Sequence, residues 1–184
     1  MRLAFDEVKA TQAAAAFLCL APDNTLNFMA LIKLLYMADR AAVQRLGLPI
    51  TTDNYVSMKH GPVTSKLYNR MKLDDGSAPT FWTSHVNRTG LLVKLKVDPN
   101  RTELSLAEEK IIKETYAAEG HQTSFALADK CHQQFPEWVD PGPSSKPLEI
   151  ADIVTALGLS EDEAANIEGL ISLQRASATF AEMR

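Results

Sequence analysis

Three residues with chemically versatile side chains, Lys33, Tyr36 and Asp39, recur along one side of a predicted helix. Lys33 and Tyr36 lie three residues apart and are therefore neighbours on a helix surface, and Asp39 continues the same side. An ammonium, a phenol and a carboxylate in one row can form a polar patch that meets a partner. The same row can instead form a half-buried network that fixes the helix against residues 55–66. Because unpaired buried charges are costly, such a network must be nearly fully hydrogen-bonded.

The turn His-Gly-Pro-Val at residues 60–63 is the strongest local feature of the chain. Gly permits backbone angles that other residues avoid, and Pro is favoured at the start of a helix, here predicted over 62–71. Free backbone N–H groups at that start can hold an acidic side chain, with His60 and Lys66 assisting. Arg70 extends this basic surface. The alternative is a tight strand-to-helix connection beside a solvated charged face.

Cys131 and His132 are adjacent, a pattern that raises metal binding or nucleophilic chemistry as hypotheses. Neighbouring residues on a helix point about 100° apart, and the sequence contains no C-x-x-C or H-x-x-x-H spacing that would supply further ligands. We therefore expect no metal site, and interpret His132 as a structural histidine with Trp138 packed nearby. Trp138 as an interface anchor is the alternative.

Motifs that would indicate an enzyme are missing from the sequence. It contains no G-x-S-x-G, H-E-x-x-H, Walker A or G-x-G-x-x-G pattern. We expect no enzymatic activity and no cofactor.

Hydrophobic spacing and capping signals predict a mainly helical chain. Gly47 is placed to end a long central helix, and Ser105 with Glu108 has the spacing of a capping box. Helices are expected over 6–21, 27–46, 62–71, 105–120, 123–134, 148–157 and from 160 onward. Strands are expected over 81–86 and 91–97, joined as a hairpin by 87–90, with 55–59 extended, 74–79 a turn and 135–147 irregular. The predicted fold class is α+β: a predominantly helical single domain with a small antiparallel β-hairpin inserted near the middle.

The segment 150–170 superficially resembles a helix-turn-helix, with Gly158 between two helices. Its second helix would begin Glu161-Asp162-Glu163, and phosphates would repel three acids at that end. DNA binding through this unit is therefore not expected, and the acids are better explained as favourable charges at a helix start. The final helix is amphipathic enough to pack on the domain or on a partner.

Charge is unevenly distributed along the 184 residues. The net charge is −4, yet residues 1–102 carry 13 Lys/Arg against 8 Asp/Glu, whereas residues 103–184 carry 6 against 15. The overall balance argues against broad nucleic-acid binding, and the asymmetry fits either two faces with different partners or complementary halves.

The sequence shows no secretory-signal pattern and no apolar run long enough for a membrane span. With only two cysteines, both expected as free thiols, we expect a cytoplasmic protein.

An ordered set of short motifs resembles the Panacea domain, the SocA-like family of prokaryotic antitoxins also found in phage-associated proteins. The motifs are KLLYMADR at 33–40, GLPIT at 47–51, Asp53, Tyr55, GPV at 61–63, Leu104-Ser105, Cys131-His132 and PEW at 136–138. The resemblance spans roughly residues 5–150. It suggests a Panacea domain over 1–150, with 151–184 as a C-terminal helical extension packed on it.

The resemblance implies a type II antitoxin that binds a cognate protein toxin directly and masks its active surface. An alternative role is a proteolytic adaptor that delivers the toxin to a cellular AAA+ protease. The partner-binding candidates are Lys33, Tyr36, Asp39, Arg40, Tyr55, His60, Lys66, Arg70 and Trp138. Gly61, Pro62 and His132 are the structural candidates of the motif set.

Overall fold

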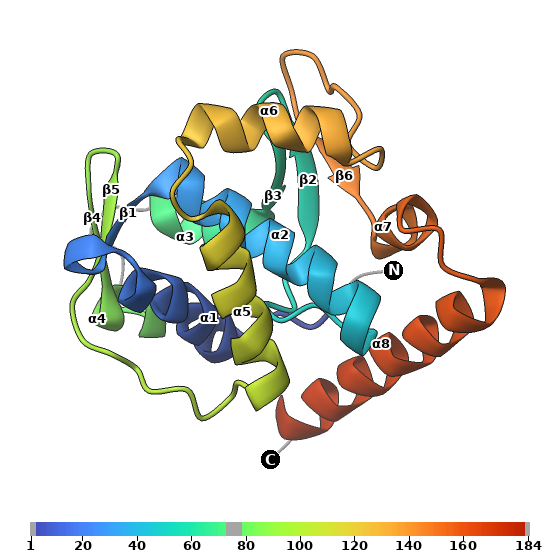
Figure 1. Ribbon diagram of the computed structural model, residues 1–184. Coiled ribbons are helices and arrows are strands. Elements are labelled where there is room, and N and C mark those ends of the chain that lie inside the picture. Colours follow the sequence, from blue (N-terminus) through green and yellow to red (C-terminus); the bar gives the residue numbers. More distant parts are fainter. Residues whose placement is uncertain (1–2, 73–78, 183–184) are drawn as a thin grey trace.

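A computed structural model describes residues 3–72 and 79–182, with side chains described up to Thr179 (Figure 1). The helices are α1 (Glu7–Leu20), α2 (Phe28–Leu46), α3 (Ser65–Lys72), α4 (Phe81–His85), α5 (Leu106–Glu119), α6 (Ser124–Gln134), α7 (Ile150–Ala156) and α8 (Glu161–Glu182), with a 3-10 turn at Pro22–Asn24. One antiparallel sheet has the strand order β1 (Thr25–Asn27), β5 (Leu92–Leu95), β4 (Val86–Thr89), and the other has the order β3 (Gly61–Thr64), β2 (Tyr55–Met58), β6 (Lys146–Leu148). The fold is α+β and predominantly helical, as predicted.

Helix α2 forms the centre of the molecule. It contacts α1 and α5 on one side and α6 and β3 on another (Figure 1). A helix surrounded in this way must bury nearly all of its faces, and Leu31, Leu34 and Leu35 are at most 1% exposed. The Asn27 side chain caps its start by accepting from Met29 N at 2.9 Å, and Gly47 ends it with φ +82°. The predicted helix over 27–46 is confirmed except at its first residue, because Asn27 is the N-cap and the last residue of β1.

Side-chain caps also fix the starts of other helices, including the predicted capping box of Ser105 and Glu108. Ser105 and Glu108 form a reciprocal capping box at the start of α5, and Thr123 caps α6. Ser160 and Glu163 make the equivalent hydrogen bonds at the start of α8. These interactions are local in sequence, which is why spacing alone reveals them.

The predicted helix over 62–71 is wrong in its first three residues. Residues Gly61–Thr64 are strand β3, which pairs with β2 in the register Tyr55↔Thr64 and Met58↔Gly61. Pro62 therefore lies in an edge strand, where its missing N–H costs no ladder hydrogen bond. Helix α3 begins only at Ser65, because the first turn is held by a carboxylate from an earlier loop, described below.

The predicted strand over 81–86 is also wrong. Residues Phe81–His85 form α4, because Thr80 and Thr83 make a capping box and Trp82 N donates to Glu7 Oε1 at 3.1 Å. The strand begins at Val86, and the hairpin itself is present as β4 paired with β5, Val86↔Leu95 through Thr89↔Leu92. Strand β5 is shorter than the predicted 91–97, and most of the predicted turn at 74–79 lies outside the described residues.

Strands β1 and β6 were not predicted. β1 pairs with β5 in the register Thr25↔Lys94, and β6 pairs with β2 in the register Tyr55↔Leu148. Each strand has three residues and depends on a partner more than 60 positions away, so its local sequence carries little signal. β6 occupies the end of the segment that we expected to be irregular.

The C-terminal helices lie at one edge of the molecule, with α8 extending past α7 (Figure 1). Ile167 and Ile171 of α8 are buried, and Leu170 Cδ1 approaches Gly47 so closely that a Cβ there would lie 2.9 Å from it. Gln174 also reaches the N-terminal segment, donating to Ala4 O at 2.8 Å and accepting from Ala4 N at 3.1 Å. No helix within the described residues has the length and apolarity needed to cross a membrane.

Candidate functional site

The polar row on α2 lies inside the protein. Lys33, Tyr36 and Asp39 are each 0% exposed, and Tyr55 of β2 is 3% exposed. They do not form an exposed polar patch. The arrangement matches the alternative that the sequence left open, a network that joins α2 to the segment around β2 and β3. A direct contact between these side chains and a partner would require the core to open.

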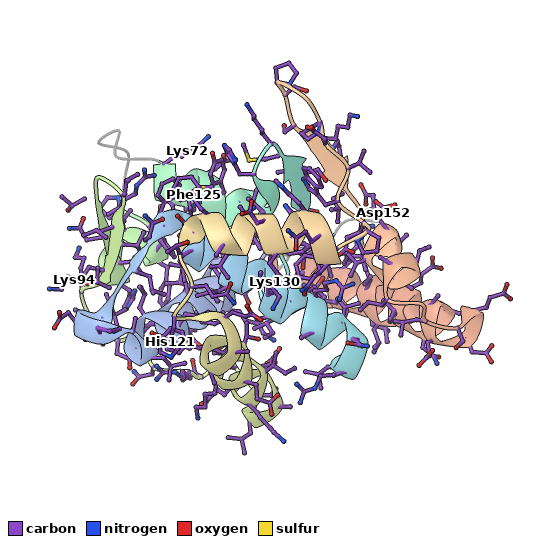
Figure 2. The ribbon with its side chains drawn as sticks, turned by 45° about the horizontal axis from the view of Figure 1, so that its top comes forward. Lys72, Lys94, His121, Phe125, Lys130 and Asp152 are labelled. Atoms are coloured by element: carbon purple, nitrogen blue, oxygen red, sulfur yellow. The ribbon has the colours of Figure 1, made fainter. Side chains whose placement is uncertain are left out.

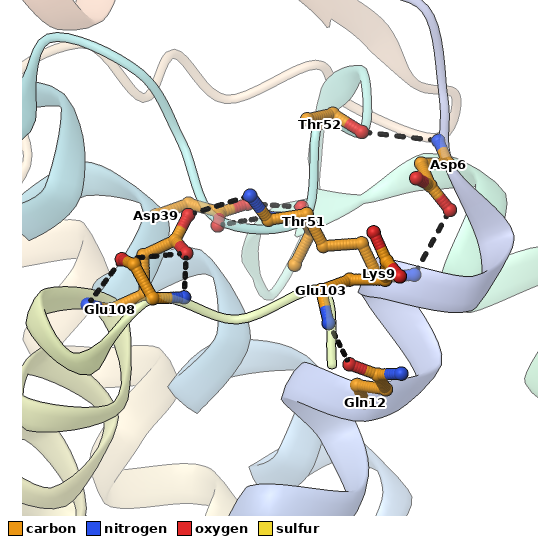
Figure 3. A network of polar contacts seen from close by, with 9 residues as sticks. Asp6, Lys9, Gln12, Asp39, Thr51, Thr52, Glu103 and Glu108 are labelled. Carbon is orange, nitrogen blue, oxygen red and sulfur yellow. Dashed lines mark hydrogen bonds and ion pairs between the residues drawn. The ribbon is translucent and has the colours of Figure 1, made fainter. Parts of the chain in front are cut away.

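Asp39 is the centre of the first part of this network. Its Oδ1 accepts from Thr51 N at 2.9 Å, and its Oδ2 accepts from Thr51 Oγ1 and, at 2.9 Å, from the Tyr55 hydroxyl (Figure 3 shows the contacts to Thr51). Burial raises the pKa of the Asp39 carboxyl to about 7, even though these hydrogen bonds oppose the increase. Asp39 thus holds the loop after α2 and strand β2 against the central helix.

Asp53 supplies the carboxylate that starts α3. Its Oδ1 accepts from Lys66 N at 3.0 Å and from Asn54 N at 2.6 Å, and its Oδ2 accepts from Leu67 N at 2.9 Å. Free N–H groups at a helix start can hold an acidic side chain, and at the start of α3 this side chain belongs to the protein's own loop. Burial raises the pKa of Asp53 to about 6. The start of α3 is therefore already occupied.

Lys33 ties α2 to strand β3. Its Nζ donates to Pro62 O at 2.8 Å, and burial lowers the pKa of its ammonium to about 8. Gly61 packs against it: a Cβ at Gly61 would lie 3.0 Å from both Lys33 Nζ and Cys131 Cβ. With φ +96°, position 61 is suited to glycine for both conformational and packing reasons. Gly61 therefore brings the β2–β3 hairpin next to α2 and α6.

Glu137 accepts hydrogen bonds from two side chains of α2, Tyr36 and Arg40. Its Oε1 accepts from the Tyr36 hydroxyl at 2.9 Å and from Arg40 Nε at 2.7 Å, and its side chain is fully buried. The Arg40 guanidinium also lies 4.7 Å from the centre of the Phe135 ring. Glu137 and Asp53 were not among our site candidates, although both stand in the motifs that carried the family resemblance. Their pairing with α2 and α3 depends on tertiary contacts between distant segments.

An exposed surface lies directly over this network. Trp138 Nε1 donates to Met58 O at 2.9 Å, at the end of β2, and His132 of α6 stacks on the Trp138 ring at 4.0 Å between ring centres and 19° between planes. Lys59 and His60 follow Met58 in the hairpin turn. We call Lys59, His60, His132 and Trp138 the turn face: the first three are exposed and Trp138 is half-buried. The turn face brings together three residues that the sequence analysis singled out as partner-binding or structural candidates, His60, His132 and Trp138, from three different segments of the chain.

Lys66 and Arg70 of α3 make internal contacts outside the turn face. Lys66 Nζ lies 5.0 Å from the centre of the Phe5 ring, and Arg70 Nη2 pairs with Glu7 Oε2 at 2.8 Å. Both residues thus help to fix the N-terminal segment to α3. His60 and Lys59, in contrast, make no hydrogen bond or ion pair with any described residue.

Comparison with known proteins gives one clear relationship. The family model described as "Antitoxin SocA-like, Panacea domain" matches residues 31–139, which is more than half of the chain and runs from α2 to just after Trp138. No curated protein and no solved structure matches. The matched region contains the buried network and the whole turn face.

Proposed function

The chain belongs to the SocA-like antitoxin family with a Panacea domain, and from that premise we propose that it binds and neutralises a cognate protein toxin by direct contact. The turn face is the proposed contact surface. The observation that carries this choice is the stack of the exposed His132 on the half-buried Trp138, beside Lys59 and His60. Aromatic anchors flanked by exposed charge are typical of protein interfaces.

The buried network has a positioning role in this proposal. Lys33, Asp39 and Glu137 connect α2 to the strands and loops beneath the turn face, so those segments need not order when the toxin binds. Pre-ordering of this kind lowers the entropic cost of association. Neutralisation by masking requires no catalysis by this chain. We place the encounter in the cytoplasm, which agrees with the free thiols of Cys19 and Cys131.

Co-expression tests the proposal. The neighbouring gene is induced alone and then together with this protein, while growth and co-purification are followed. We expect growth arrest that this protein relieves, with both chains recovered in one complex. Toxicity that persists despite a folded, expressed protein would contradict the proposal.

Surface variants then test the turn face. Lys59→Glu reverses a charge in the turn and should weaken co-purification and neutralisation by at least about tenfold in apparent affinity. The matched control is Lys94→Glu, which changes an exposed lysine on β5 that is not part of the turn face. Figure 2 shows Lys94 on the side of the molecule opposite Asp152. Equal effects of both variants would exclude the turn face as the contact.

The lifetime of the toxin in the cell distinguishes masking from delivery to a protease. A toxin whose cellular lifetime shortens when this protein is present would indicate delivery to a protease in place of masking.

A further inference from the structure

Helices α7 and α8 enclose an apolar groove of about 240 Å³ that lies outside the turn face. Its floor consists of four buried aliphatic side chains, Ile150, Val154, Ile167 and Ile171. Its rim contains Ala151, Thr155, Ala164 and Glu168. The volume is smaller than the range of about 300–1,000 Å³ found for small-molecule sites. The groove therefore suits one or two aliphatic side chains of a protein segment.

Acidic side chains lie on both of the helices that form this groove. Residues 147–174 contain six Asp or Glu and no Lys or Arg. Asp152, Glu161, Asp162 and Glu168 are exposed, and no Lys or Arg in the described part of the chain forms an ion pair with any of them. Figure 2 shows Asp152 on α7, on the opposite side of the molecule from Lys94.

From this combination of shape and charge, we propose that the α7–α8 groove binds an amphipathic helical segment of a partner protein that carries Lys or Arg. An aliphatic side chain of the segment enters the groove, and its cationic side chains face Glu168 and the acids in the first turn of α8. Helix-in-groove recognition uses apolar anchors in this way, and the charges add orientation and speed of association. Nucleic acid is disfavoured at the same surface, because phosphates meet the same acids.

A designed peptide tests the groove without any toxin. The probe is a fluorescein-labelled helical peptide of about 14 residues, with leucines spaced along one face and lysines elsewhere. Its companion replaces every lysine with glutamate. We expect the lysine peptide to bind the full chain, measured by fluorescence anisotropy, and to weaken between about 50 and about 300 mM NaCl. Failure of the lysine peptide to bind at low salt, or equal binding of the glutamate peptide, would overturn the proposal.

Three variants locate the binding site. Ala164→Phe fills the groove and Glu168→Lys reverses the charge at its rim, and each should weaken the lysine peptide by at least about tenfold. Asp129→Lys, which changes an exposed acid on α6, is the matched control and should have less than about a twofold effect. Circular dichroism confirms that each variant is folded. If Asp129→Lys weakens binding as much as Glu168→Lys, the attraction is general electrostatics and the groove is not the site.

A second copy of this chain is the competing occupant. Sedimentation of the unmodified protein and of Ala164→Phe distinguishes the two. A self-association that Ala164→Phe abolishes would replace the partner segment with another protomer and overturn the proposal. Neither result depends on the antitoxin role, since toxin neutralisation is measured separately by growth.

Discussion

The Tyr55 hydroxyl donates a 2.9 Å hydrogen bond to Asp39 Oδ2 in the interior, joining strand β2 to the central helix α2. Tyr55 also meets Tyr36 edge to face, with 5.4 Å between ring centres. No Lys or Arg of the described chain pairs with Asp39, so hydrogen bonds alone stabilise its carboxylate. The contact therefore links two residues of the family motifs.

Tyr55→Phe removes one hydrogen bond to Asp39 while preserving the ring. We expect the free energy of unfolding to fall by about 1–2 kcal/mol, measured by urea denaturation at neutral pH. Tyr68→Phe on α3 is the control, because the hydroxyl of Tyr68 has no hydrogen-bond partner among the described residues while Lys72 Nζ lies 4.0 Å from its ring centre. Equal stability of the two variants would show that the Tyr55–Asp39 bond contributes nothing.

Asp39→Asn should change how stability depends on pH. Because the pKa of Asp39 is about 7 in the folded chain against 3.8 as the reference value, the folded state holds a proton that the unfolded state releases between these values. The contribution of Asp39 to the free energy of unfolding is therefore fully present below about pH 4 and falls as pH rises towards 7, by up to about 1.4 kcal/mol per pH unit.

The asparagine variant lacks this contribution, so its deficit relative to the wild type should be larger at acidic than at neutral pH. Urea denaturation across the window measures the difference. Asp53, with a pKa of about 6, adds a slope of the same sign to both proteins, so the difference between them reports the loss of Asp39 and of its repulsion with Asp53. A deficit that is constant with pH would refute the assignment.

Gly61→Ala should destabilise the fold more than Gly90→Ala. Both glycines have positive φ, +96° and +60°, so each substitution carries a backbone cost of about 1–2 kcal/mol. A Cβ at Gly90 meets nothing within 4 Å, whereas one at Gly61 lies 3.0 Å from Cys131 Cβ and from Lys33 Nζ. We expect Gly61→Ala to cost about 1–3 kcal/mol more, because the tight packing must adjust. Thermal unfolding of the two variants tests this, and identical melting temperatures would contradict it.

Arg40→Met should reveal the cost of leaving the Glu137 carboxylate with Tyr36 as its one remaining side-chain partner among the described residues. The Glu137 side chain is fully buried and that of Arg40 is 18% exposed, so we expect a loss of about 3 kcal/mol in unfolding free energy. Arg45→Met is the matched control: its pair with Glu114 has exposed side chains on both sides, and its loss should be close to the measurement error. A similar loss in both variants would contradict the importance of burial.

Gln174→Ala tests the proposed division into residues 1–150 and an extension, 151–184, packed on them. The variant loses both hydrogen bonds to Ala4, so the amide of Ala4 should exchange with solvent deuterium faster. Ser177→Ala, an exposed position on the same helix, is the control. Unchanged exchange at Ala4 would mean that α8 does not hold the N-terminal segment in solution.

The sequence alone determined what depends on near neighbours. Gly47 marked the end of α2, and Ser105 with Glu108 marked the start of α5, because each makes its contact within a few residues. The helix-dominated fold class and the β4–β5 hairpin followed from the same kind of signal. The family motifs also identified the segments that build the site, including Asp53 and Glu137, but not what those two side chains contact.

Tertiary structure decided where the polar residues lie and what they bind. Lys33, Tyr36 and Asp39 are buried because β3, β2 and Glu137 supply their partners from segments far along the chain. Long-range pairing also converted 61–64 into a strand and created β1 and β6. The turn face exists only because Trp138 bonds to Met58 and stacks on His132. Hydrogen-bonding groups distant in sequence stabilise each other only when folding brings them together, and spacing along the chain does not encode that meeting.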